Sequence, residues 1–290
     1  VYSAMSRMDV VEWLSTEEKQ AYCFGKQMHQ YDENKYRMLL TYYPAGLLHY
    51  CIKIITKSTS AENIERVMNV LTSIKNTWQA DRRLSPIEES FLSEILKRIT
   101  NSLYSDKWGK FCTELYLSNI LTEIPEPAER YFFEHPPEFI QSLDLSKEAN
   151  HDKFWELLFM YRLPNSAYTD LDALKYFSES LIAENQTDLL GNIYGRAIAG
   201  TDGIFPHESI RELLEQFDSD ELDLQVYIAY INDRDARSVL DGSDQMQKAA
   251  KFTADARALS ISYPHTTAIL RQIADDYRRE GQSDRLYSEL

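Results

Sequence analysis

Six histidines are the residues of this chain best suited to metal binding or acid–base catalysis, and they are spread over its whole length. They are His29, His49, His135, His151, His207 and His265. A zinc protease needs two histidines one helical turn apart with a glutamate between them, and no HExxH occurs. His49 and Cys51 are two residues apart, so on a helix they point in different directions. We therefore expect surface or capping histidines, and we predict neither a metal site nor a cofactor.

Four glycines between residues 191 and 203 are the next candidates, as a phosphate-binding loop. They are Gly191, Gly195, Gly200 and Gly203. Their spacing is not G-x-G-x-x-G, and no Gly-Lys-Ser/Thr is present, so neither common nucleotide loop fits. Gly191 and Gly195 are one helical turn apart, which predicts a small-residue face where another helix crosses closely. A serine nucleophile in a G-x-S-x-G turn is also absent.

An acidic run could suggest a calcium site. It consists of Asp218, Asp220, Glu221 and Asp223. An EF-hand loop that started at Asp218 would need glycine at its sixth position and glutamate at its twelfth, but Asp223 and Ala229 stand there. Ser219 as a helix cap, with acids in the first helical turn, explains the run without a metal.

Acid–base catalysis by two carboxylates requires groups that converge. The adjacent pairs, such as Glu88 with Glu89 and Asp275 with Asp276, diverge on a helix. One sequence does not show whether distant residues converge, so we predict no catalytic residue and keep an enzyme as an alternative.

The elements that carry these residues are expected to be helices. The 290 residues include only 9 glycines, and no interval offers successive strands with period-two alternation. Capping boxes at Ser15/Glu18 and Ser85/Glu88 mark two helix starts. The sequence predicts an all-α fold, an irregular array of antiparallel helical hairpins, either as an α-solenoid or as two packed helical subdomains.

One hairpin is predicted from residues 61–80 and 87–103. Both segments carry apolar residues at spacings of three and four, and only a short polar break separates them. Trp78 and Phe91 are expected to lie in one core. The other predicted helices are 16–30, 33–43, 45–57, 106–122, 147–162, 170–185, 187–199, 207–217, 220–232, 244–262 and 266–280.

Charge is divided unevenly along the chain. Residues 1–120 hold 15 basic and 14 acidic side chains, whereas residues 121–290 hold 16 and 32. The change coincides with a proline-rich stretch, Ile124 to Pro137, whose aromatic residues argue against a free linker. We therefore predict a near-neutral helical subdomain at 1–123 and an acidic helical subdomain at 124–290.

The C-terminal end carries the pattern of a known repeat. The pattern consists of Pro264, Leu270, Ile273, Ala274, Tyr277 and Gly281. With the alanine-rich segment before it, this stretch resembles one degenerate tetratricopeptide repeat over about residues 249–281, although Leu270 stands where tryptophan is usual.

The resemblance implies a helix that ends at Gly281 and lines a peptide-binding surface. The residues that it assigns to a partner are Arg271, Asp275 and Arg278, which share one stripe. Guanidinium groups there could hold an acidic or C-terminal peptide. The alternative is that Arg271 and Asp275 form an ordinary exposed pair.

The function that the sequence favours is a non-enzymatic helical protein-interaction or regulatory module. Its partner is a protein or peptide, and a basic partner would bind residues 121–290 in a salt-sensitive way. The alternative is a nucleic-acid-contacting helical-repeat module that uses residues 53–110, where ten basic residues face seven acidic ones. A third reading is an unrecognised all-helical enzyme. The oligomeric state is not indicated.

The compartment is inferred from composition. No run approaches the roughly 18 apolar residues of a membrane span, so we expect no membrane contact. The three cysteines, Cys23, Cys51 and Cys112, are too few and too scattered for a disulfide framework. We predict small buried thiols in a cytoplasmic protein. The start at Val1 suggests part of a longer protein.

Overall fold

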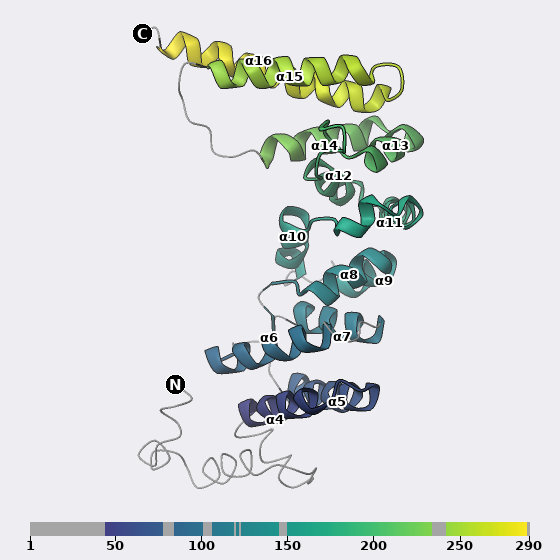
Figure 1. Ribbon diagram of the computed structural model, residues 1–290, viewed down its shortest axis with the longest axis vertical. Coiled ribbons are helices and arrows are strands. Elements are labelled where there is room, and N and C mark those ends of the chain that lie inside the picture. Colours follow the sequence, from purple (N-terminus) through teal and green to yellow (C-terminus); the bar gives the residue numbers. More distant parts are fainter. Residues whose placement is uncertain are drawn as a thin grey trace. The chain divides into compact units, whose positions relative to one another are not determined.

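The computed structural model describes residues 44–77, 84–100, 106–118, 120–121, 123–144, 150–233 and 242–288. These ranges hold the α-helices α4 to α16 and one 3-10 helix, η2, and they contain no strand (Figure 1). The all-α prediction is confirmed. The predicted helices 16–30 and 33–43, the capping box Ser15/Glu18 and Trp78 lie outside the described residues.

Contacts divide the chain into two compact units, Val1–Tyr131 and Phe132–Leu290. The division falls inside α8, a few residues beyond the change predicted between 123 and 124. Each unit is described by itself.

The first unit is built around α4, the most buried of its helices. Its helices are α4 (Pro44–Lys57), α5 (Ala61–Thr77), α6 (Pro86–Thr100), α7 (Asp106–Leu117) and α8 (Glu126–Glu134), which extends past the division. Nine of the 14 residues of α4 are buried, so this helix offers apolar surface on several sides. One continuous core therefore joins it to its neighbours, with Leu48, Val67, Leu92 and Trp108 fully buried.

The predicted hairpin of residues 61–80 with 87–103 is wrong in its pairing. Helix α6 packs mainly against α4, and α5 packs against α4 and α7. The ring of Phe91 lies 5.5 Å from that of His49 on α4. The physical reason is that α4 is apolar on two sides, and the apolar faces of α5 and α6 each cover one of them.

The start of α6 has the predicted capping box. The Ser85 hydroxyl accepts the Glu88 backbone N–H at 3.3 Å, and the Glu88 carboxylate accepts the Ser85 backbone N–H at 2.9 Å. Two backbone donors that lack helical partners are thereby satisfied.

The prolines of residues 124–137 begin helices instead of only separating them, a point that the sequence reading missed. Pro127 lies in the first turn of α8, and Pro136 and Pro137 open α9. Proline is tolerated there because the first turn has no use for its missing N–H. The stretch is no free linker, as expected, since its aromatic residues Tyr131, Phe132 and Phe133 are buried, as is Phe139 just after it.

The second unit begins with an aromatic core. Its helices are α9 (Pro136–Leu143), α10 (His151–Met160), η2 (Asn165–Tyr168), α11 (Leu171–Ala183), α12 (Thr187–Gly195), α13 (Glu208–Phe217), α14 (Asp220–Asn232), α15 (Ser243–Leu259) and α16 (Pro264–Ser288). The ring of Phe132 lies 4.7 Å from Phe139, 4.8 Å from Tyr161 and 5.3 Å from Phe177.

The two helical glycines allow α12 and α14 to pack closely, as the sequence predicted. A Cβ atom on Gly191 would lie 2.2 Å from the Cβ of Gln225, and one on Gly195 would lie 2.4 Å from the Cβ of Ala229. Neither distance is physically acceptable, so glycine is required at both positions for this crossing.

The C-terminal helices α15 and α16 lie side by side over most of the length of α15 (Figure 1). The repeat-pattern residues Leu270, Ile273, Ala274 and Tyr277 form the buried face of α16. Gly281, however, does not end the helix, which continues to Ser288. Its missing Cβ instead lets the backbone of Gly242 and the side chain of Met246 approach. None of the described helices is both long and apolar enough to cross a membrane.

Candidate functional site

A hollow of about 510 Å³ lies between α14 and α16 in the second unit. Tyr227 of α14 lines it, together with five polar residues of α16. These five are Gln272, Asp275, Arg278, Arg279 and Gln282. They face outward because the intervening apolar positions of α16 are buried.

Ion pairs organise the walls of this hollow. Arg278 pairs with Asp275 and also donates from Nη2 to the Thr253 hydroxyl of α15 at 3.3 Å. Asp276, also on α16, accepts a hydrogen bond from the Tyr227 hydroxyl of α14 and pairs with Arg279. The guanidinium groups are thus held in place but partly exposed, with 42% of the Arg278 side chain and 73% of the Arg279 side chain accessible.

The hollow contains two of the three predicted partner-binding residues. Asp275 and Arg278 line it, while Arg271 is exposed on the same helix and is not among the lining residues. Asp275 pairs with Arg278 rather than with Arg271. Among the described residues, Arg271 has no ion-pair or hydrogen-bond partner, so its guanidinium is accessible to a ligand.

Sequence reasoning missed the other lining residues. Gln282 lies four residues after Arg278, and Arg279 four residues after Asp275, so an extended helical stripe could have found both. Tyr227 is more than forty residues away on α14, and nothing in its sequence context indicates that it joins α16.

A second group of polar residues surrounds the start of α16. The imidazole of His265 faces Asp223 through Nδ1 at 2.6 Å and Asp218 through Nε2 at 2.8 Å. The two carboxylate oxygens of Glu215 accept the backbone N–H groups of His265 and Thr266, each at 3.1 Å. An acidic side chain of α13 therefore caps α16 from outside the helix.

The pKa values of His265 and Asp223 in this group are both raised above their usual values. Burial alone would lower the pKa of His265, but the hydrogen bond and charge of Asp223, the hydrogen bond to Asp218 and the charge of Glu215 outweigh it, so this pKa is raised. Burial raises the pKa of Asp223, although its hydrogen bond to His265 opposes the shift. An imidazolium with both N–H groups donating fits the geometry.

The histidines were expected to be surface or capping residues, and His265 combines a position at a helix start with specific ion pairs. Ser219 caps α14 as predicted, since its hydroxyl accepts the Leu222 N–H at 3.2 Å. One side-chain atom each of Asp220, Asp223 and His265 lies within 4.8 Å of the others. Because both ring nitrogens of His265 already face carboxylates, we assign an ion-paired cluster rather than a metal centre.

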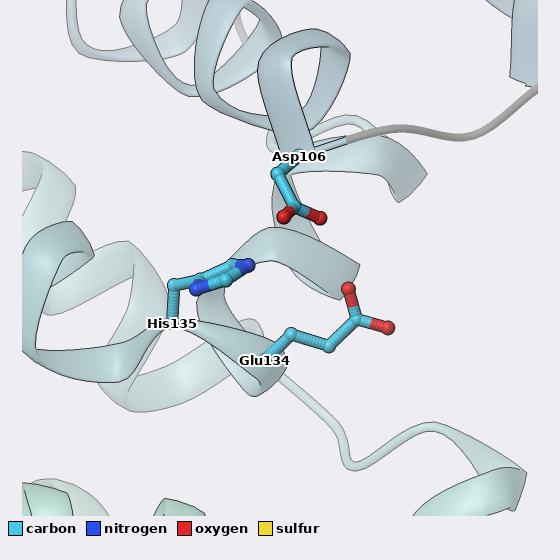
Figure 2. A group of neighbouring side chains, drawn as sticks. All are labelled: Asp106, Glu134 and His135. Atoms are coloured by element: carbon cyan, nitrogen blue, oxygen red, sulfur yellow. The ribbon is translucent and has the colours of Figure 1, made fainter.

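A second group of metal-binding residue types is drawn in Figure 2, where Glu134 ends α8 and His135 precedes α9. The third residue in the figure, Asp106, begins α7 and belongs to the first unit. We infer no site from residues of separate units.

His207 and Ser209 form a contact that resembles part of a hydrolase site. The His207 Nδ1 atom lies 2.9 Å from the Ser209 hydroxyl, and it also accepts the Ser209 backbone N–H. This is the geometry of a helix cap at the start of α13, and Ser209 is buried. We therefore interpret the contact between His207 and Ser209 as a helix cap and not as part of a catalytic site.

The basic residues of 53–110 are partly neutralised inside the first unit. Arg82 and Arg83 of this set lie outside the described residues. The observed pairs are Lys75 with Glu114, Lys107 with Glu65, Arg98 with Glu94 and Arg66 with Glu62. Their charge is therefore less available to a phosphate backbone than the sequence count suggests.

The cysteines that can be assessed are buried thiols, as predicted. Cys51 and Cys112 are free and 0% exposed, and burial raises the pKa of each. Cys23 lies outside the described residues.

Comparisons with protein-family models, with curated proteins and with solved structures found no match to this chain.

Proposed function

We propose that this chain is a non-enzymatic protein-interaction module that binds a segment of a partner protein in the hollow between α14 and α16. The observation that carries the proposal is the hollow itself, about 510 Å³ in volume and lined by guanidinium, carboxamide, carboxylate and phenol groups. Such groups can bind a peptide backbone and its carboxylates at the same time.

The local charge supports an acidic or C-terminal peptide as the ligand. Residues 121–290 carry twice as many acidic as basic side chains, yet α16 gathers Arg271, Arg278 and Arg279 beside the hollow. An incoming carboxylate would find the accessible guanidinium of Arg271 and could exchange with Asp275 at Arg278. We take residues 249–281 to be tetratricopeptide-like on the basis of their buried pattern, and we place the protein in the cytoplasm on the basis of its two buried free thiols.

The nucleic-acid alternative has weaker support because four of the basic side chains in 53–110 pair with acids. It predicts binding through the first unit, whereas the peptide proposal predicts binding through the second. The enzyme alternative is supported only by the clusters at His265 and His207, which also serve as helix caps.

The test is binding to an immobilised library of peptides that end in a free carboxylate, with the same sequences amidated as a matched set. We expect selective retention on the free-carboxylate peptides. Arg271→Ala/Arg278→Ala should weaken the binding at least about tenfold, because a hydrogen bond to a charged group contributes roughly 1.5–3 kcal/mol.

The matched control is Lys175→Ala/Arg257→Ala, which removes two positive charges of the same unit outside the hollow. Both double variants should unfold within about 0.5 kcal/mol of the parent protein. Equal binding by the hollow variant and the parent protein, or binding that the control weakens as much, would show that the hollow is not the site.

A further inference from the structure

The N-terminal end of α16 is held by residues from two other helices. Asp218 at the end of α13 and Asp223 on α14 each contact one ring nitrogen of the His265 imidazole. Helix α16 packs against both α13 and α14, so this single side chain connects three helices. Only the imidazolium form has two N–H groups that can donate to both carboxylates at once.

The groups that face His265 are acidic. Glu215 and Asp218 come from α13 and its C-terminal end, and Asp220 and Asp223 come from α14. A cation at a helix N-terminus is opposed by the helix dipole, so these carboxylates are what makes a charged His265 favourable.

The remaining helix packed against α16 is α15. The charged residues of its last turns are Asp255, which pairs with Lys251, and Arg257, which is exposed. Neither makes a described contact with His265. On α16 itself, the nearest charged residue is Arg271, six positions further along the chain.

We propose that the protonated imidazole of His265 is a pH-dependent clamp that fastens the start of α16 to α13 and α14, and that its deprotonation loosens this attachment. Loss of the proton leaves one ring nitrogen as an acceptor opposite a carboxylate, which replaces attraction by repulsion. Since α16 forms one wall of the hollow and α14 the other, the clamp would also control the shape of the hollow. This last consequence rests on the proposed function, whereas the clamp does not.

The sign of the effect follows from the direction of the shift. Because the pKa of His265 is raised in the folded protein, the clamp contributes fully below the unfolded value of about 6.5 and is lost as pH rises through the folded value. The clamp is therefore closed in mildly acidic solution and opens towards alkaline pH.

The first measurement is an NMR titration of the histidine side chains in the full chain. His265 should titrate above the value of about 6.5 for an unperturbed histidine. Asp218→Asn, which changes a side chain that is 84% exposed, should lower the midpoint. A midpoint at or below that of an unperturbed histidine would overturn the proposal.

The second measurement is amide hydrogen exchange of residues 264–272 at pH 6 and pH 8.5, corrected for the intrinsic exchange rate at each pH. The parent protein should lose protection at the higher pH, by roughly tenfold for each unit that separates the folded and unfolded pKa. His265→Gln removes the titrating group and should abolish this pH dependence. His151→Gln, the same change on α10, should retain it.

An equal loss of protection in His265→Gln and in the parent protein would overturn the clamp, as would no loss in the parent protein. If His265→Gln does not fold, Asp218→Asn decides the question, because it must move the loss of protection to lower pH. The experiment needs no partner, so its failure is distinguishable from failure of the peptide-binding proposal.

Discussion

Gly195 of α12 packs directly against Ala229 of α14. A Cβ atom on the glycine would lie 2.4 Å from the Cβ of Ala229 and 2.6 Å from the backbone oxygen of Val226. A flexible side chain could move away from such a contact, but a helix backbone does so only if the two helices separate. This close approach fixes the position of α14, which forms one wall of the hollow.

Gly195→Ala should therefore destabilise the protein even though alanine is the better helix former. The helix-propensity gain is at most about 1 kcal/mol, and overpacking of a core typically costs about 1–3 kcal/mol. We expect a net loss of roughly 1–2 kcal/mol in chemical unfolding. Ala258→Val, which adds bulk at an exposed position of α15, is the control and should change stability by less than about 0.7 kcal/mol.

The loop between α12 and α13 depends on a buried arginine. Arg211 is 1% exposed, pairs with both oxygens of Asp202 at 2.6 and 2.8 Å, and donates to the Pro206 carbonyl at 2.6 Å. Arg211→Met should lower the free energy of unfolding by about 3 kcal/mol, because it removes the buried donor that the Asp202 carboxylate and the Pro206 carbonyl share. The exposed Arg257→Met should leave it nearly unchanged, and equal effects of the two changes would contradict this role.

The same loop should make the protein sensitive to acid. The hydrogen bond from Arg211 holds the pKa of Asp202 down at about 2, and the hydrogen bond from Thr201 does the same for Glu208. A lowered pKa contributes stability above the unfolded value of about 4, and this contribution is lost as pH falls towards 2.

Asp202→Asn should thus lose more stability at pH 6 than at pH 2.5, measured by urea unfolding at each pH. Glu212→Gln, at an exposed position of α13, should not show this difference. A pH-independent effect of Asp202→Asn would mean that its charge contributes nothing.

The buried thiols provide a test of the core of the first unit. Cys51 and Cys112 are fully buried, so the thiolate that reacts with alkylating reagents is disfavoured at both. Peptide mapping after treatment with iodoacetamide should find both unmodified in the native protein and modified in urea. Rapid labelling of either in the native state would contradict the core described for α4 and α7.

Local patterns predicted most of the helices, and distant contacts account for what they did not predict. The Ser85/Glu88 box, the Ser219 cap and the Gly191/Gly195 face each depend on residues within one or two turns, and all three are present. The pairing of α6 with α4 depends on which apolar faces compete for cover, which periodicity does not contain.

For the candidate sites too, the sequence predicted the local features and missed the contacts between helices. The stripe of Asp275 and Arg278 was visible in the sequence, but Tyr227 and the partners of His265 come from other helices. Helix α16 also continues through Gly281, because packing against Gly242 and Met246 favours a helical glycine at a position where a repeat would turn. Tertiary contacts override local propensity at this position.

The most direct test of the proposed binding site is site-specific photo-crosslinking. A photoreactive residue is introduced at Gln272 within the hollow, or at Lys175 on α11 as the control, and each protein is irradiated with the free-carboxylate peptides retained from the library. We predict crosslinks from position 272 that are lost in Arg271→Ala/Arg278→Ala, and none from position 175. Crosslinks from position 175 alone, or crosslinks from 272 that the double variant leaves unchanged, would contradict binding in the hollow between α14 and α16.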